Sequence, residues 1–391
     1  MEYPINKMPD QDSAKNQVNS SDDVQKNIQT SQKSSADSGE AKFYQRIQKM
    51  PQSIYPILSS IDQLKGQWQG GTGLSPQILN RLRQSALITS AGASTRIEGS
   101  VMTDDEVRSL MQGLNITKMR DRDREEVQGY IDASNFIQEN FANINLSENH
   151  FKQIHQILLG HSSKDYSHRG EYKHLPNDVV ARDASGQEVG VVFRTLTPFE
   201  TPLAMSSLVN WLNDVFSRQD IHPLIIIGSF VVEFLRIHPF VDGNGRMSRL
   251  LTDLLMLKSG FTYTPYVSLE KIIEDTKTDY YLALRSSQAT FDTADENIND
   301  WIQYFLQICE TQARSAAAII SHDNMETLLS ATQYKVYEKA TQLGEFAVRD
   351  LEFLLDVPRP TIRQALEKLE GMGVIESLGA GRGARYRMIP K

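Results

Sequence analysis

One short stretch, residues 237–249, constrains this chain more than any other part of its sequence. It reads IHPFVDGNGRMSR and follows an apolar run from Leu224 to Leu235. That run is long enough for a buried helix and too interrupted by polar residues to span a membrane. Pro239 is expected to end the helix, because the residue before a proline is pushed away from helical backbone angles. An imidazole, a carboxylate, a Gly-Asn-Gly turn and two guanidinium groups are therefore expected beside a buried helix end.

This combination of residues suits the binding of phosphate. Gly243 and Gly245 permit positive φ and close backbone approach, so the amides of residues 242–246 can form a concave anion nest. The nest would lead into a second helix, whose positive dipole end also favours an anion. Arg246 and Arg249 lie three residues apart, so they would share a face of that helix and contact neighbouring phosphoryl oxygens.

Two further side chains of the stretch add chemistry. Asp242 is placed to hold a divalent metal, Mg²⁺ or Mn²⁺, which prefers hard oxygen ligands shared with phosphates. His238 follows the helix end, where a neutral imidazole can take a proton from an attacking hydroxyl. Taken alone, His-Pro-Phe is usually a helix end and Asp-Gly-Asn-Gly a tight turn. The joint pattern at fixed spacing favours the phosphate site.

The stretch also resembles the signature of Fic-domain proteins, which reads His-x-Phe-x-(Asp/Glu)-Gly-Asn-Gly-Arg-x-x-Arg, and it fills every specified position. Most enzymes of that family transfer AMP from ATP to a hydroxyl of a target protein. The resemblance implies a mainly α-helical chain, with a Fic-type core that carries a β-hairpin flap.

The resemblance also implies a role for each residue of the signature. His238 would be the general base toward a Ser, Thr or Tyr hydroxyl of the target. Asp242 would hold the metal that bridges the α- and β-phosphates, and Asn244 and the glycine amides would bind phosphate oxygens. Arg246 would stabilise the departing pyrophosphate, and Arg249 would fix the γ-phosphate so that the α-phosphate lies in line for attack.

A second informative stretch, SAGASTRIEGS, covers residues 90–100. On its own it is a helix of small residues ending at Glu-Gly, with Gly99 as an ordinary C-cap. Beside a Fic signature, Ser94 and Glu98 also match the family's inhibitory motif, (Ser/Thr)-x-x-x-Glu-(Gly/Asn), which is typical of class II members when it precedes the core. The resemblance implies an inhibitory helix at about residues 86–99, in which Glu98 pairs with Arg249 and Ser94 adds a hydrogen bond.

Two other features bear on the substrates. Residues 179–182 and 189–193 are short β-type runs around a turn at 183–186, which predicts a hairpin within about 177–194. In the Fic family such a flap aligns the target segment by strand addition, whereas the plain alternative is a surface hairpin. Tyr281 matches a family position near adenine, but the position seven residues later is Gln288 instead of Asn.

The chain as a whole is predicted to hold several units. Residues 1–41 are polar and expected to be disordered, 42–115 form an N-terminal helical region, and 116–315 form the core. Residues 330–391 resemble a winged helix-turn-helix with residues 361–368 as recognition helix. From residue 332 onward, ten Lys or Arg face eight Asp or Glu, a balance of +2. Two roles are equally open for this unit. One is DNA binding, with phosphate contacts from the wing arginines 382, 385 and 387, and the other is protein interaction or dimerisation.

Composition limits the remaining possibilities. A formal net charge of −8 argues against a surface devoted entirely to nucleic acid. The single cysteine, Cys309, excludes an intramolecular disulfide and fits a reducing compartment. The other seven histidines include no His-Glu-x-x-His pair and are interpreted as surface or packing residues. With neither a signal-type N-terminus nor eighteen uninterrupted apolar residues, a cytoplasmic protein without a membrane span is expected.

The function that these patterns favour is autoinhibited protein adenylylation with ATP and Mg²⁺, and self-modification is a natural extension of it. Two alternatives stay open on the sequence alone. The same site could remove AMP from a modified protein, with Glu98 activating water. The chain could instead be a transcriptional regulator whose core senses nucleotide for the winged helix. Transfer of another phosphate-linked group is a further variant.

Overall fold

The structure is a computed structural model that describes residues 41–70, 74–113, 120–182, 188–372, 374–379 and 384–389, with backbone alone at 179–182, 188–192 and 321–328. Residues 1–40 of the predicted disordered tail lie outside the described residues, whereas residue 41 begins a helix that runs to residue 48. None of the described helices combines the length and the apolar character that a membrane span requires.

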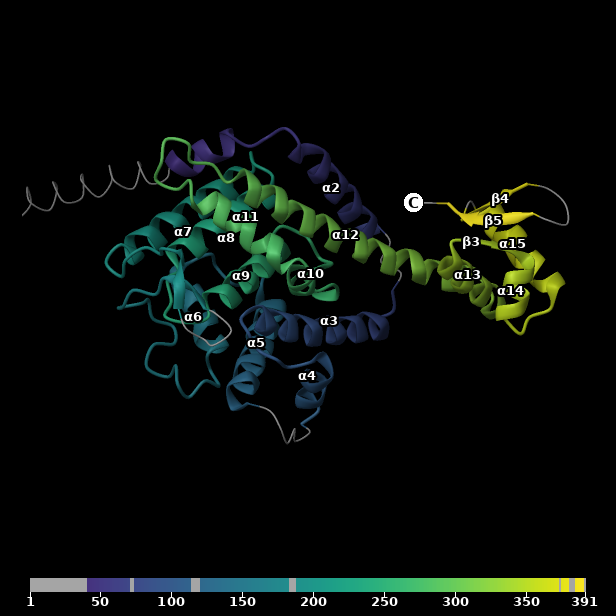
Figure 1. The fold of residues 1–391 in the computed structure, drawn as a ribbon, viewed down its shortest axis with the longest axis horizontal. Coiled ribbons are helices and arrows are strands. Elements are labelled where there is room, and N and C mark those ends of the chain that lie inside the picture. The colour runs from purple at the N-terminus through teal and green to yellow at the C-terminus, as the bar shows by residue number, and fades with distance from the viewer. Residues whose placement is uncertain are drawn as a thin grey trace, which may run out of the picture.

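The chain is mainly α-helical, as predicted, and most helices surround one hydrophobic core (Figure 1). The helices of this part are α2 (Ile54–Gly70), α3 (Pro76–Ile97), α4 (Asp104–Met111), α5 (Asp121–Asn140), α6 (Glu148–Leu158), α7 (Thr201–Arg218), α8 (Pro223–Ile237), α9 (Asn244–Lys258), the 3₁₀ helix η1 (Thr264–Tyr266), α10 (Leu269–Asp275), α11 (Lys277–Gln288) and α12 (Asn299–Leu328).

Local signals explain where several of these helices begin. Ser75 caps α3 by accepting a hydrogen bond from the amide of Ile78, and Pro76 occupies the first turn. Thr103 and Glu106 form the two reciprocal bonds of a capping box at the start of α4. These caps fix the two ends of the segment that carries the predicted inhibitory motif.

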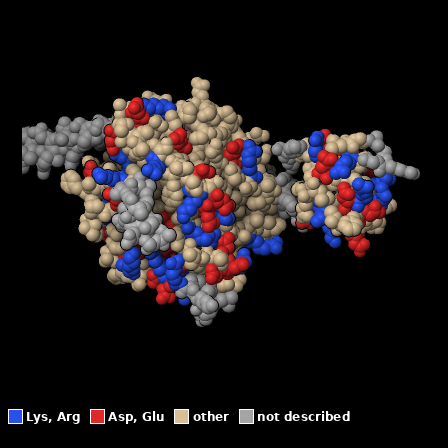
Figure 2. Space-filling view, in the orientation of Figure 1, with Lys and Arg blue, Asp and Glu red and all other residues tan. Residues whose placement is uncertain are grey.

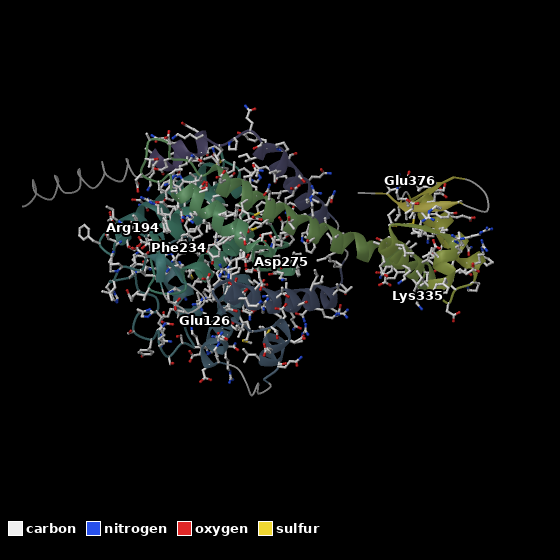
Figure 3. All side chains as sticks on the ribbon, viewed as in Figure 1. Glu126, Arg194, Phe234, Asp275, Lys335 and Glu376 are labelled. Carbon is white, nitrogen blue, oxygen red and sulfur yellow. The ribbon has the colours of Figure 1, made fainter. Side chains whose placement is uncertain are left out.

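Helix α8 lies at the centre of the core. Every residue from Leu224 to Ile237 is buried, and Phe234 is seen among the packed helices in Figure 3. The strands β1 (Val179–Arg182) and β2 (Glu188–Phe193) form an antiparallel hairpin with Val180 opposite Val191, which agrees with the two predicted β-type runs. The predicted turn at residues 183–186 lies outside the described residues.

Helix α12 runs past residue 315, where the core was predicted to end. It continues without interruption to Leu328, because residues 299–328 contain neither glycine nor proline. Ser330 and Gln333 then form a capping box that starts the next helix. A single helix therefore connects the core with the C-terminal unit (Figure 1).

The C-terminal unit packs around a hydrophobic cluster of its own. Its elements are α13 (Ala331–Leu343), β3 (Glu345–Ala347), α14 (Val348–Leu354), α15 (Arg359–Gly371), β4 (Ile375–Leu378) and β5 (Arg385–Met388). The sheet has three strands in the order β3-β5-β4, so the expected two-stranded wing gains a third strand from residues 345–347. This topology suits a winged helix, which stays an interpretation, and Arg382 lies outside the described residues.

Candidate active site

The imidazole of His238 is held by the end of α8. His238 is the C-cap of α8 and adopts a left-handed backbone conformation with φ 51°, which is uncommon for a non-glycine residue and clusters at functional positions. Its Nδ1 atom lies 3.2 Å from the carbonyl oxygen of Leu235. A carbonyl can only accept, so Nδ1 carries the proton and Nε2 keeps a lone pair free.

The electrostatic surroundings keep this imidazole neutral. Burial lowers the pKa of His238 to about 4, and the nearby ammonium of Lys173 acts in the same direction. The carbonyl of Leu235 and the carboxylates of Glu98 and Asp242 oppose that shift without cancelling it. A neutral imidazole with a free Nε2 can accept a proton at physiological pH.

Two buried side chains hold the loop that follows His238. The amide group of Asn244 accepts a hydrogen bond from the Phe240 N–H at 2.9 Å and donates to the Phe240 carbonyl at 2.7 Å. The ring of His155 stacks on Phe240 with centroids 3.7 Å apart. His155 Nδ1 accepts from the amide of Gly170, so its Nε2–H donates to the carbonyl of Asp242 at 3.0 Å. Asn244, predicted to bind phosphate, therefore also braces the loop.

The predicted nest forms at the start of α9. Gly243 has φ 80° and is the N-cap of the helix, a conformation that glycine adopts without strain. Asp242 Oδ1 accepts from the Gly243 amide at 2.6 Å and lies 3.3 Å from Arg246 Nη2. Although partial burial opposes ionisation, Arg246 and this amide hold the pKa of Asp242 below its usual range. Asp242 is therefore an ionised carboxylate at the mouth of the nest.

Arg246 is buried and keeps donors available for an anion. Only 2% of its surface is exposed, and its Nη1 atom is 3.8 Å from Glu126 Oε2. Its Nε and Nη1 atoms have no hydrogen-bond partner within the described part of the chain. Buried donors of this kind suit the oxygens of a phosphate bound at the helix N-terminus.

Arg249 contacts the segment that carries the inhibitory motif. Its Nε donates to Ser94 Oγ and its Nη2 to the Ser94 carbonyl, both at 2.9 Å. The same Nη2 atom lies 2.9 Å from Glu98 Oε1. Arg249 is 3% exposed, and Glu98, the C-cap of α3, covers it from the cavity side. The structure thus contains the ion pair that the sequence motif predicts.

Gly245 does not have the positive φ that the sequence predicted, and its role is steric. It lies within α9 instead of having positive φ, and its missing side chain leaves room for Glu98. A Cβ atom built at Gly245 would lie 2.1 Å from Glu98 Oε1. The carboxylate of Glu98 therefore rests directly on the first turn of α9, beside the nest.

These groups surround one cavity of about 470 Å³. Of the predicted site residues, the cavity is lined by Glu98, His238, Asp242, Gly243, Asn244, Gly245, Arg246 and Tyr281, whereas Ser94 and Arg249 lie behind Glu98. Helix α11 supplies the other wall with Tyr281, Leu284, Arg285 and Gln288, which face the same way at helical spacing. The polar nest at one end and this longer wall suit a nucleotide better than a free phosphate.

Sequence reasoning missed three residues here. Tyr280 lines the cavity, and burial raises the pKa of its phenol to about 12, while Arg249 beside it acts in the opposite direction. His155 and Lys173 hold the loop of His238 from outside the cavity. The helical spacing of Tyr280 from Leu284 offered a weak signal, whereas no local pattern indicated His155 or Lys173.

A divalent ion fits this site only together with its substrate. No group of three or more His, Cys, Asp or Glu side chains that could hold a metal occurs among the described residues. Asp242 offers an ionised carboxylate with 30% of its side chain exposed. Mg²⁺ is commonly bound by one or two carboxylates together with water and substrate phosphates. The donor set present here is therefore compatible with a metal that arrives with a nucleotide.

Comparison with known proteins shows what this site is similar to. Residues 145–256 match the model of the Fic/DOC family. The protein adenylyltransferase Fic of Drosophila melanogaster is 27% identical over 209 residues, covering 53% of this chain and 38% of the relative. The protein of the same name from Drosophila persimilis is 26% identical over 213 residues. The chain thus spans well under half the length of the curated relatives that it matches.

Solved structures show the same fold. A Fic family protein from Desulfovibrio desulfuricans superposes with a TM-score of 0.58 at 22% identity, covering 88% of this chain and 98% of the other. A Fic domain-containing signaling protein from Bacteroides thetaiotaomicron gives 0.56 at 24% identity, with coverage of 67% and 97%. The helical core agrees with both solved structures, and residues 145–256, which contain the signature, are similar to the Fic/DOC family.

Proposed function

We propose that the protein is an autoinhibited adenylyltransferase, which transfers AMP from ATP to a Ser, Thr or Tyr hydroxyl of a protein. The observation that carries this proposal is the ion pair between Glu98 and Arg249, which lies against the same nest and cavity as the neutral imidazole of His238. The names of the curated relatives support the choice of AMP as the group transferred.

The reaction follows from the positions of these groups. ATP would place its phosphates against the amides of the nest and the buried donors of Arg246. The hydroxyl oxygen of the target attacks the α-phosphorus, the bond from that phosphorus to the bridging oxygen of the β-phosphate breaks, and pyrophosphate leaves. The hydroxyl proton passes to His238 Nε2, so the protein gains a phosphodiester-linked AMP.

The negative charge of the phosphates would be balanced by residues of this chain and by a metal ion. Arg246 faces the phosphates from the first turn of α9, where its buried guanidinium stabilises charge on the leaving group. Mg²⁺ held by Asp242 would neutralise phosphate oxygens and favour the in-line arrangement. A 1 Å error in such an arrangement can cost about 10²-fold in rate, so each of these contacts matters.

Inhibition is a direct result of the ion pair. Glu98 occupies a guanidinium that would otherwise contact the γ-phosphate, and its carboxylate adds a negative charge beside the nest. ATP would therefore bind with its terminal phosphate displaced, and its α-phosphate would be poorly aligned for attack. Removal of the carboxylate is expected to restore alignment without any change at His238.

The test compares variants that separate these roles. Purified chains are incubated with α-labelled ATP and Mg²⁺, and label bound to protein is measured. We expect the Glu98→Gly and Glu98→Gln chains to incorporate AMP into their own hydroxyls, the unaltered chain to incorporate far less, and Glu98→Gly with His238→Ala to incorporate none. His161→Ala in the Glu98→Gly chain is the matched control, because this imidazole is exposed and outside the cavity. Incorporation that survives His238→Ala would contradict the assigned base.

A second candidate function uses the same geometry. Glu98 lines the cavity with His238 and is 34% exposed, so it could activate a water that releases AMP from a modified protein. In that case an AMP-modified protein would lose its label with the unaltered chain and keep it with Glu98→Gly. The two activities therefore respond to the same substitution in opposite directions.

A further inference from the structure

Lys173 is a buried lysine whose three N–H bonds are all used. Only 3% of its surface is exposed. Its ammonium donates to Asn177 Oδ1 at 2.7 Å, to Thr195 Oγ1 at 2.9 Å and to the carbonyl of Ile237 at 3.0 Å. An ammonium has three donors, so these three acceptors match it fully. Burial of a charge among neutral oxygens is costly unless such a set of bonds is complete.

The three acceptors belong to two parts of the site. Asn177 precedes β1 and Thr195 follows β2, so both ends of the hairpin are attached to this ammonium. Ile237 is the last residue of α8, next to His238. The backbone amide of Lys173 also donates to the carbonyl of Pro239 at 2.8 Å, which holds the loop on the other side of the imidazole.

Further bonds complete the same connection. Asn177 Nδ2 donates to the carbonyls of His238 and Phe240 at 3.1 and 2.6 Å. The hydroxyl of Thr195 donates to Asn177 Oδ1 at 2.9 Å, and the amide of Leu196 donates to the Arg236 carbonyl at 3.3 Å. The hairpin base and the loop of His238 therefore share one hydrogen-bond network, with Lys173 at its centre.

We propose that Lys173 is a positioning residue that fixes the base of the β1–β2 hairpin to the backbone around His238, so that a target strand paired with the hairpin presents its hydroxyl to the imidazole. This proposal rests on the function proposed above. Lys173 takes no part in the chemistry, since its donors are bonded to Asn177, Thr195 and Ile237 and it does not line the cavity. It acts on the acceptor protein more than on the nucleotide, because the nest belongs to α9.

The first measurement is made in the Glu98→Gly chain. Lys173→Met removes the ammonium and keeps an unbranched side chain. We expect it to lower AMP incorporation by roughly tenfold or more. ATP affinity is measured in chains that also carry His238→Ala, so that no turnover occurs. We expect Lys173→Met to change this affinity by less than about twofold, because the hairpin that Lys173 holds is separate from the nest that binds the phosphates. Lys173→Arg should retain more incorporation than Lys173→Met, since a guanidinium keeps charge and donors.

Two further variants protect the interpretation against simple misfolding. Thr195→Val removes one acceptor of the ammonium with little change in volume, and it should lower incorporation in the same direction and add little to Lys173→Met. Lys65→Met is the matched control, because Lys65 donates to the Ser259 carbonyl at 2.8 Å and lies over the Phe261 ring at 4.2 Å, outside this network. Incorporation by Lys173→Met at the parent rate, or a loss of ATP affinity equal to the loss of rate, would overturn the proposal.

Hydrogen exchange tests whether Lys173 holds the hairpin to the His238 loop, even if no AMP is transferred. If the Glu98→Gly parent incorporates no label, the proposed function fails, and the attachment is then tested by itself. Lys173→Met should speed exchange of the amides of Thr195, Leu196 and His238 by roughly tenfold or more and leave α12 unchanged. Exchange equal to that of the parent at these amides would show that Lys173 does not hold the hairpin to the His238 loop.

Discussion

At the scale of single residues, Gly245 is the position where an added methyl group has the clearest consequence. A Cβ there would lie 2.1 Å from Glu98 Oε1, so the carboxylate must leave its place beside Arg249. We expect Gly245→Ala to lower the free energy of unfolding in the unaltered chain by more than in the Glu98→Gly chain. The difference, a coupling energy of about 0.5–3 kcal/mol, is measured by a double-mutant cycle of chemical denaturation. Equal effects in both chains would mean that Glu98 does not rest on Gly245.

The imidazoles of His155 and His238 give a second prediction at this scale, on pH. Burial lowers the pKa of His155 and of His238 from 6.5 to about 4. The unfolded chain therefore binds more protons than the folded chain between these values, and the stability that each neutral imidazole provides is complete above pH 6.5 and is lost as pH falls toward 4. For His155, which is fully buried, the loss amounts to about 3 kcal/mol at most.

The measurement is the free energy of unfolding from pH 7 to pH 4. His155→Gln should reduce the slope in this window by up to about 1.4 kcal/mol per pH unit, whatever its effect at neutral pH. Asn213→Gln, at an exposed position, changes no titratable group, so it serves as the control and should keep the original slope. AMP incorporation by the Glu98→Gly chain should likewise stay constant with respect to His238 until pH approaches 4. A decline centred near pH 6.5 would contradict a base whose pKa is lowered.

At the scale of helices, Arg96 holds the C-terminal end of α3, which carries Glu98, in its place beside Arg249. This side chain donates from Nε and Nη2 to the two oxygens of Glu274 on α10 at 2.5 and 3.0 Å, and from Nη1 to the carbonyl of Met102 at 2.7 Å. Arg96 lies between Ser94 and Glu98, so these bonds fix the end of the helix that contacts Arg249. Bidentate geometry also makes lysine a poor replacement.

Arg96→Gln is therefore expected to raise AMP incorporation above that of the unaltered chain, but less than Glu98→Gly does, because the inhibitory carboxylate is still present. Arg108→Gln is the control, since Arg108 lies on neighbouring α4 and is 52% exposed. Labelled-ATP incorporation by the three variants, measured side by side, provides the check. An Arg96→Gln chain no more active than the Arg108→Gln chain would show that α3 keeps its place without this anchor.

The sequence predicted features that depend on neighbouring residues, and it missed features that depend on residues far apart in the chain. The end of α8 before Pro239 and the positive φ of Gly243 depend on neighbouring residues, and the structure has both. Lys173 and His155 depend on partners up to 87 residues away, which no local pattern reveals. The extension of α12 past residue 315 was missed because a domain boundary was expected where no helix-breaking residue stands.

At the scale of the whole molecule, the C-terminal unit lies at the far end of α12 and carries mixed charges (Figures 1 and 2). The arginines of its sheet are paired within the unit. Arg385 Nε lies 2.7 Å from Glu345 Oε1, and Arg387 pairs with Glu376. Phosphate contact would require these pairs to open, and an exposed pair is worth little to stability while it still cancels the local positive charge.

We therefore expect the full chain to form no detectable complex with a duplex of about 20 bp at ~150 mM salt. The Glu345→Gln, Glu376→Gln double variant frees two arginines, so it should bind more tightly at low salt and steepen the dependence of log affinity on log salt by up to about 2. The Glu310→Gln, Glu139→Gln double variant, on α12 and α5 and outside the unit, is the control for the same change in net charge. Fluorescence anisotropy across a salt series measures all three chains. Tight binding by the unaltered chain at ~150 mM salt would instead favour the DNA-binding regulator, because two neutralised arginines cannot supply such an affinity through phosphate contacts alone.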